Sequence, residues 1–263
     1  MAIPAKSVAV GTALTVTVGG SAAIGAKYLL SESIEDFVSL KSSDHANKYA
    51  SDYWKYFLSN EEGKNSKGWE KLFKKLSDDK KVTENPRTVG NKFNSLSDVD
   101  ALKNACVVAY GSDKNNVVTS SPTDSQYSEE DVWRYCSAVN RKPTAAGVFP
   151  KEGGTGGQKE SEGYPENSFG RQNKDQLVSI TDPENALFWD VQEKWFFKKE
   201  DNGSDRTFSG NGSSIFKKLY DSGKGSLKDV CEEGYKLTSA NANNKVDEND
   251  LFKFCSLKGS KTT

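Results

Sequence analysis

The chain has 263 residues, of which 35% are hydrophobic and 28% are charged. This length suits one large domain or two of about 100 residues each, and the low apolar share predicts small cores with much solvated surface. The net charge of −1 gives no basic field to attract a phosphate backbone, so we expect no nucleic-acid partner. His45 is the only histidine, which excludes any site that needs two imidazoles.

The N-terminal segment at 7–26 is uncharged and is flanked by Lys6 and Lys27. A stretch of this length can cross a bilayer as a helix, although its glycines, serines and threonines reduce its hydrophobicity. We interpret residues 1–30 as a transmembrane anchor. A signal peptide cleaved among the small residues at 19–23 is one alternative, and a buried helix or glycine-rich loop is another. The positive-inside rule places the N-terminus in the cytoplasm and the C-terminal bulk outside the cell, or secreted if the segment is cleaved.

The next segment contains aromatic residues that are mostly one helical turn apart. They are Tyr49, Tyr53, Trp54, Tyr56 and Phe57. This spacing is typical of a helix face that packs into a core; an exposed platform for carbohydrate is the alternative. After a polar turn at 60–67, the apolar positions at 69–76 predict a second helix.

Two motifs occur once in each half of the chain. The pattern Leu-Lys-x-x-Cys-x-x-x-Tyr lies at 102–110 and again at 227–235. An acidic, an aliphatic, an aromatic, a basic and another aromatic residue, followed by Cys and Ser, lie in that order at 131–137 and at 250–256. We therefore predict a mainly α fold, with two tandem, related small helical modules behind an N-terminal hydrophobic membrane segment.

The first module is expected at 31–140 and the second at 181–263. The order of apolar and basic residues at 215–219 matches that at 72–76, so we expect the helices that contain these segments to be equivalent. Three prolines and a glycine run disrupt any helical pattern at 141–180. This segment is therefore predicted to be a flexible linker, with brief extended pieces at most.

Helix ends can be predicted from capping residues. Ser97 with Asp100 forms a capping pair that predicts the start of the first cysteine helix, and Gly111 is suited to its end. Ser128 and Asp247 are predicted to cap the closing helices of the two modules.

The four cysteines fall two and two into corresponding places, which favours disulfides within each module: Cys106 with Cys136, and Cys231 with Cys255. Each bridge would close a loop of about 25–30 residues and contribute roughly 3.5 kcal/mol in the chain-entropy model. Four free buried thiols are the alternative. A zinc site is less favoured, because the spacings are far from C-x2-C and all four thiols would have to come from two modules.

No familiar catalytic pattern is present. His45 lies far from every cysteine in the sequence, and adjacent acidic pairs on a helix point away from each other. We therefore predict no catalytic, cofactor-binding or metal-binding residues. The polar loops at 61–67, 112–126 and 200–211 are expected to be exposed and to provide variable or contact surfaces.

The small-residue N-terminal segment and the two cysteine motifs resemble the paralogous families of short hypothetical surface proteins of haemotropic mycoplasmas, which are wall-less bacteria attached to red blood cells. The resemblance covers residues 1–40 and both cysteine modules. It implies surface exposure, with host-cell contact or antigenic variation as the role, and a host-cell surface component as a partner. It supplies no activity and no catalytic residue.

From these observations we expect a membrane-anchored, surface-exposed protein of the binding or antigen type. It would contact the membrane through residues 7–26. An exported hydrolase-like enzyme with a cleft between the modules is one alternative, and a passive structural coat protein is another.

Overall fold

The computed structural model describes residues 37–81, 88–148, 159–200, 203–240, 242 and 244–262. Within these residues the chain is mainly helical, with nine α-helices and one two-stranded sheet. No helix in these ranges is long and apolar enough to cross a membrane. The predicted membrane segment at 7–26 lies outside the described residues.

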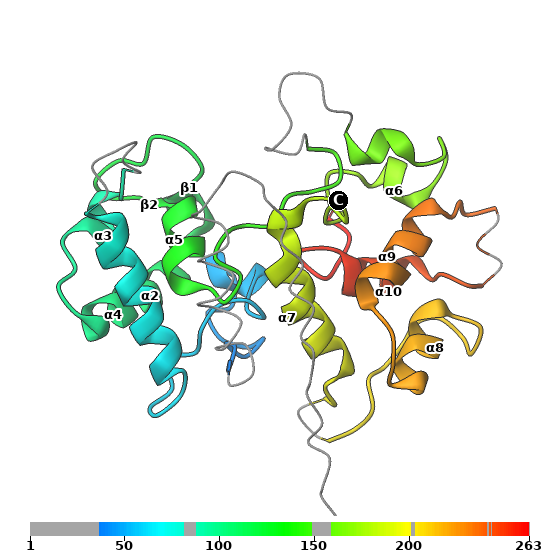
Figure 1. Cartoon of the computed structure of the whole chain (residues 1–263), viewed down its shortest axis with the longest axis horizontal. Helices are drawn as coiled ribbons and strands as arrows, with labels where there is room; N and C mark the ends of the chain where they lie inside the picture. The colour runs from blue at the N-terminus through cyan, green and yellow to red at the C-terminus, as the bar shows by residue number, and fades with distance from the viewer. Residues whose placement is uncertain are drawn as a thin grey trace, which may run out of the picture.

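The first half of the chain, here residues 37–140, has four α-helices and a short parallel pair of strands in its described part. Its elements are η1 (Tyr49–Asp52), α2 (Ser66–Asp79), α3 (Asn91–Asn94), α4 (Val99–Tyr110), η2 (Lys114–Asn116), β1 (Val117–Val118), β2 (Tyr127–Ser128) and α5 (Glu129–Cys136). Helices α2 to α5 gather in one lobe of the molecule (Figure 1).

Among the described residues of the second half, here residues 141–262, there are five α-helices. Its elements are η3 (Glu160–Gly163), α6 (Phe169–Gln172), η4 (Pro183–Asn185), α7 (Ala186–Phe197), α8 (Ile215–Ser222), α9 (Leu227–Lys236) and α10 (Glu248–Cys255). Helices α6, α8, α9 and α10 form the other lobe, while α7 lies between the lobes beside the segment around residue 50 (Figure 1).

Capping side chains explain where several helices begin. Ser128 accepts a hydrogen bond from the backbone N–H of Asp131 at the start of α5, and Asp247 caps α10 as predicted. Helix α4 is capped by Asp98 rather than by the predicted Ser97, and it ends at Gly111 as expected.

The aromatic segment around residue 50 is buried as predicted, but it is not one helix. Only η1 is helical, and Phe57 pairs in an isolated antiparallel bridge with Ser137. The backbone N–H of Leu58 donates to the carbonyl of Cys136. This pairing with the end of α5 fixes the segment as extended chain, while Tyr56 and Phe57 remain fully buried.

The segment at 141–180 also differs from its prediction. It contains helix α6, and an isolated bridge joins Leu177 to Ser256. Leu177 and Val178 are buried in the same contiguous hydrophobic cluster as residues from both halves. The expectation that no helix forms here is therefore wrong, because long-range contacts order a sequence that lacks helical periodicity.

Candidate functional site

Both predicted cysteine pairings are confirmed. Cys106 of α4 is bonded to Cys136 at the end of α5, with a Cα–Cα distance of 5.6 Å. Cys231 of α9 is bonded to Cys255 at the end of α10, with a Cα–Cα distance of 5.7 Å. All four cysteines are fully buried. Each bridge therefore joins two helices from inside the core.

A buried tyrosine lies beside each disulfide. The Tyr110 hydroxyl donates to the carbonyl of Cys136 at 2.7 Å, and the Tyr235 hydroxyl donates to the carbonyl of Cys255 at 3.0 Å. Burial raises the pKa of both hydroxyls well above the ordinary value of 10, so both stay protonated. These hydroxyls satisfy carbonyl groups at the ends of α5 and α10, which makes their role structural.

The two halves meet along a surface that we call the seam. It is formed by Asp52, Trp54, Lys55 and Tyr56 of the first half and by Phe188, Gln192 and Trp195 of α7. The Tyr56 hydroxyl donates to Gln192 Oε1 at 3.0 Å, and the Tyr56 ring lies 5.4 Å from that of Phe188. Gln192 in turn donates to the carbonyl of Phe254 at 2.9 Å. The centre of the seam is thus aromatic packing with its polar atoms paired.

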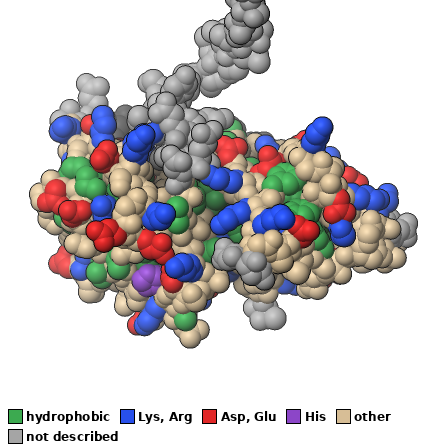
Figure 2. All heavy atoms as spheres, turned by 90° about the horizontal axis from the view of Figure 1, so that it is seen from below, with side chains coloured by type: hydrophobic (Ala, Val, Ile, Leu, Met, Phe, Trp, Pro, Cys, Tyr) green, Lys and Arg blue, Asp and Glu red, His purple; other side chains and the backbone are tan. Residues whose placement is uncertain are grey.

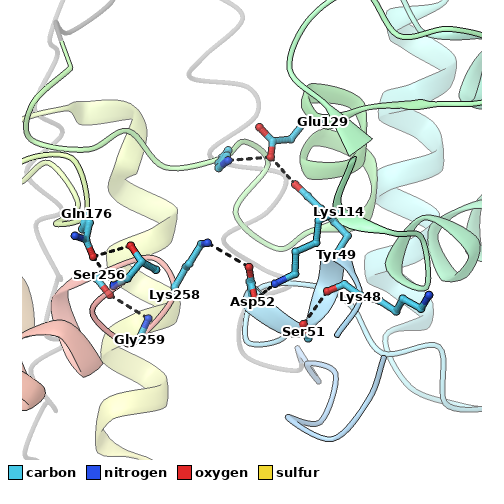
Figure 3. Close-up of polar contacts among 12 residues, drawn as sticks. Lys48, Tyr49, Ser51, Asp52, Lys114, Glu129, Gln176, Ser256, Lys258 and Gly259 are labelled. Carbon is cyan, nitrogen blue, oxygen red and sulfur yellow. Dashed lines mark hydrogen bonds and ion pairs between the residues drawn. The ribbon is translucent and has the colours of Figure 1, made fainter. Parts of the chain in front are cut away.

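The margin of the seam is charged. Asp52 accepts hydrogen bonds from Lys114 Nζ at 2.7 Å, and its other oxygen lies 3.3 Å from Lys258 Nζ (Figure 3). Partial burial opposes ionisation of Asp52, but the two lysines outweigh it, and the net effect lowers its pKa. Because Lys114 belongs to the first half and Lys258 to the second, this carboxylate links them.

A second carboxylate, Glu129, is buried near this margin (Figure 3). Its Oε1 accepts hydrogen bonds from the Tyr49 hydroxyl at 2.9 Å and from Lys142 Nζ at 2.8 Å. Trp133 Nε1 donates to the same Tyr49 hydroxyl at 2.8 Å. Both donors bind the same carboxylate oxygen, so the group holds the Tyr49 hydroxyl and Lys142 in place beside the aromatic side chains.

Lys55 differs from these paired charges. Its side chain is 8% exposed, and its Nζ lies 3.6 Å from the centre of the Trp195 ring. Burial, then the nearby charges of Arg206 and Lys253, lower the pKa of Lys55 to about 7. In the described part of the chain its ammonium group has no ion pair or hydrogen bond, and its partners are aromatic rings.

Arg206 stabilises the end of α7 next to Lys55. Its guanidinium donates to the carbonyls of Trp195, Phe196 and Lys198 and pairs with Glu200 at 3.1 Å. Its Cζ lies 3.9 Å from the Trp195 ring. The predicted exposed loop at 200–211 is therefore wrong at this position, because Arg206 is buried at the C-terminus of a helix, where a cation is favoured.

Sequence reasoning missed both of these residues. The sequence holds one indication that Lys55 is unusual, because it is the only charged residue in the aromatic run from Tyr53 to Phe57. The sequence holds no such indication for Arg206, because the carbonyls that it binds become its neighbours only when the chain folds.

Two of the hollows among the described residues differ greatly in size. One has a volume of about 510 Å³, is open to solvent and is lined by Phe169, Ala242, Val246 and Glu248, among others. The other, of about 20 Å³, lies between Gly90 and Asp131 and has room for about one water molecule. No group of three or more potential metal ligands occurs in this part of the chain.

Figure 2 shows Lys and Arg side chains interspersed with Asp and Glu side chains over one face of the molecule. This mixture agrees with the net charge of −1 and gives no field of a single sign on that face. Comparisons with protein-family models, with curated proteins and with solved structures gave no match.

Proposed function

We propose that the chain is an exported, membrane-anchored protein of the binding or antigen type, in which two copies of one helical unit form a rigid base for exposed loops. The observation that carries this proposal is the pair of buried disulfides, each with a tyrosine hydroxyl bound to the carbonyl of its second cysteine. Their shared geometry supports a common ancestry for the two halves.

Further contacts repeat in the same order along the chain. Trp69 Nε1 donates to the carbonyl of Ser59 at 3.3 Å, and Trp189 Nε1 donates to the carbonyl of Ser179 at 3.2 Å. This match favours α2 and α7 as the equivalent helices. The segment at 215–219, which was predicted to match 72–76 of α2, lies in α8. We therefore propose α7, and not α8, as the counterpart of α2.

An asparagine near the start of each of these helices gives a second match. Asn65 Oδ1 accepts from the backbone N–H of Val38 at 2.8 Å, and Asn185 Oδ1 accepts from that of Thr144 at 2.9 Å. Both asparagines also donate to a backbone carbonyl of the same partner residue. We therefore propose that the second copy begins near Thr144, within the predicted linker at 141–180, rather than at residue 181.

The closing helices give a third match. Asp131 in the first turn of α5 accepts from the backbone N–H of Gly90 at 2.8 Å, and Asp250 in the first turn of α10 accepts from that of Gly210 at 2.9 Å. A buried carboxylate that binds backbone N–H groups orders the loop before the helix. The same device in both halves supports the proposed duplication.

Export follows from the cysteine chemistry. Disulfides persist in oxidising surroundings and are rare in the cytosol, so two bridges that join helices within the core favour a location outside the cytoplasm. Anchoring through residues 7–26, and a C-terminal bulk on the outer surface, rest on the sequence of that segment. A host-cell surface component is the partner that this location suggests.

Contacts would come from the loops that pack least against the base. The loop at 61–64 and the tip at 119–125 are exposed in the structure, so we expect changes there to leave the core undisturbed. Antigenic variation or host-cell contact would use these surfaces. The proposed catalytic alternative, an exported enzyme with a site between the halves, is favoured by one observation only, the buried amine of Lys55 at the seam.

Brief trypsin treatment of intact cells tests the display. We expect cleavage after Lys64 or Lys67 in the exposed loop, while a cytoplasmic marker protein stays intact. The matched control replaces both lysines by glutamine, which should delay this cleavage without changing the amount of protein. Protein that resists trypsin in intact cells but is cut after lysis would contradict the proposed location.

A further inference from the structure

The open hollow of about 510 Å³ lies in the second half, between α6 and the segment that joins α9 to α10. Its wall contains Phe169 at the start of α6, Glu248 at the start of α10, and the apolar side chains of Ala242 and Val246. This volume is typical of pockets that bind small molecules. Because an aromatic ring and a carboxylate share the wall, the hollow suits a ligand that has both an apolar part and a hydrogen-bond donor.

The first half contains a counterpart of Phe169. The backbone N–H of Tyr49 donates to the carbonyl of Ser112 at 2.9 Å, and that of Phe169 donates to the carbonyl of Leu237 at 2.8 Å. In the sequence, Ser112 and Leu237 each lie two residues after the tyrosine that contacts the disulfide of that half. The ring of Phe169 therefore occupies the position that the Tyr49 ring has in the first half.

Glu248 also has a counterpart in the first half. Glu129 and Glu248 are the first residues of α5 and α10, the two helices that end in the second cysteine of each pair. Each forms an ion pair with a lysine 13 residues later, Glu129 with Lys142 at 2.8 Å and Glu248 with Lys261 at 2.7 Å. The same carboxylate–lysine pair is thus present in both halves.

The halves differ in what else reaches this carboxylate. In the first half the Tyr49 hydroxyl donates to Glu129 at 2.9 Å, and the glutamate side chain is only 10% exposed. Phe169 has no hydroxyl group. Among the described residues, Lys261 is the only side chain that donates to the Glu248 carboxylate, and the Glu248 side chain is 42% exposed. Glu248 therefore lines an open hollow and lacks the phenolic donor that its counterpart binds.

We propose that this hollow binds a neutral phenol with a substituent opposite its hydroxyl. The phenol hydroxyl donates to the Glu248 carboxylate, as the Tyr49 hydroxyl does to Glu129, and the ring packs against Phe169. Lys261 already balances the charge of Glu248, so the ligand needs no charge of its own. The substituent extends to solvent through the open side. The inference rests on the proposed duplication but on neither export nor display, so the binding and trypsin experiments can fail independently.

The test uses the full chain and N-acetyltyrosine amide as the probe, with N-acetylphenylalanine amide as the analogue that lacks only the hydroxyl. Titrations followed by ligand-observed NMR give both dissociation constants. We expect the tyrosine amide to bind about tenfold more tightly, because its hydroxyl forms a hydrogen bond to a charged group. Equal affinities, or no binding of either amide at millimolar concentration, would overturn the proposal.

A titration with p-cresol distinguishes the two sources of a phenol. An affinity at least equal to that of the tyrosine amide supports a free phenol as the ligand. Tighter binding of the amide supports a tyrosine side chain of a peptide, because the groups beyond the ring then add to the affinity.

Variants of the two matched positions locate the binding. Phe169→Tyr supplies the missing hydroxyl from the chain itself and should weaken binding at least about tenfold, whereas Phe73→Tyr, at a half-buried position in the first half, should leave it unchanged. Glu248→Gln should weaken binding several-fold, whereas Glu162→Gln, at an exposed position, should not. Wild-type affinity in Phe169→Tyr or in Glu248→Gln would contradict the assignment. Intact disulfides and an unchanged circular dichroism spectrum verify that each variant is folded.

Discussion

Tyr110 and Tyr235 make the same contact in the two halves of the molecule: the hydroxyl of each donates to the carbonyl of a disulfide-bonded cysteine. The distances are 2.7 Å to Cys136 and 3.0 Å to Cys255. Each hydroxyl also lies within hydrogen-bond distance of a second carbonyl, that of Leu58 or Val178. The tyrosines thus connect each disulfide to an extended segment that is distant in sequence.

Replacing either tyrosine by phenylalanine tests this connection. Tyr110→Phe and Tyr235→Phe each remove the hydroxyl that donates to the buried carbonyl of Leu58 or Val178, while the carbonyl of Cys136 or Cys255 keeps a backbone N–H donor. We expect each variant to lower the free energy of unfolding by about 1–3 kcal/mol. Urea denaturation provides the measurement. Tyr127→Phe is the matched control and should have little effect, because the Tyr127 hydroxyl makes no hydrogen bond in the described part of the chain. A large loss for only one of the two tyrosines would argue against equivalent roles.

The two disulfides should contribute similar amounts of stability. They close loops with sequence separations of 30 and 24 residues, for which the chain-entropy model gives about 3–4 kcal/mol each. We expect the double replacements of Cys106 with Cys136, and of Cys231 with Cys255, by alanine to lower the melting temperature by comparable amounts. Differential scanning calorimetry measures both. A variant that melts like the wild type would show that its bridge does not constrain the chain.

The seam should couple the two halves. In Tyr56→Phe the Oε1 atom of Gln192, which is buried, loses its donor. We expect a loss of about 1–2 kcal/mol in the free energy of unfolding, together with a broader urea transition as the halves unfold less cooperatively. Tryptophan fluorescence and circular dichroism should then give different midpoints. Coincident midpoints and unchanged stability would contradict the proposed coupling.

Lys55 predicts an unusual dependence of stability on pH. In the unfolded chain a lysine keeps its proton up to about pH 10.4, whereas in the folded protein burial lowers the pKa of Lys55 to about 7. Unfolding therefore takes up a proton between these two values. The contribution of Lys55 to the free energy of unfolding rises with pH by about 1.4 kcal/mol per unit in this range and is constant below pH 7.

Lys55→Met removes this titration while preserving much of the side-chain volume. We expect the variant to be more stable than the wild type at pH 6, and its advantage to shrink steadily from pH 7 to pH 9. Guanidinium denaturation at several pH values measures the difference. Lys74→Met, at an exposed position, is the control. A difference between Lys55→Met and the wild type that is independent of pH would contradict the lowered pKa.

The parts of the fold that could be predicted depend on local or repeated patterns. The cysteine pairs follow from motifs that recur at the same positions, and the caps at Ser128 and Asp247 follow from side-chain bonds that span a few residues. Gly111 ends α4 for the same kind of local reason. Such features need no knowledge of distant chain segments.

The features that could not be predicted depend on distant contacts. The spacing of Tyr53, Tyr56 and Phe57 fits a helix, but pairing between Phe57 and Ser137 fixes an extended backbone. The site around Lys55 assembles from the seam, the end of α7 and the start of a loop from the second half. Nothing near Lys55 in the sequence indicates that Trp195 will cover it. The module boundaries at 31–140 and 181–263 remain a prediction. The matched contact of Thr144 favours an earlier start for the second module.

The most direct test of the account is the redox state of the cysteines in the cells that make this protein. A membrane-permeant alkylating reagent applied before lysis blocks every free thiol, and peptide mapping without reductant then shows which cysteines are linked. An exported scaffold predicts peptides that link Cys106 to Cys136 and Cys231 to Cys255, with no alkylated cysteine. Alkylation of all four cysteines would place the chain in a reducing compartment and would contradict the proposed display.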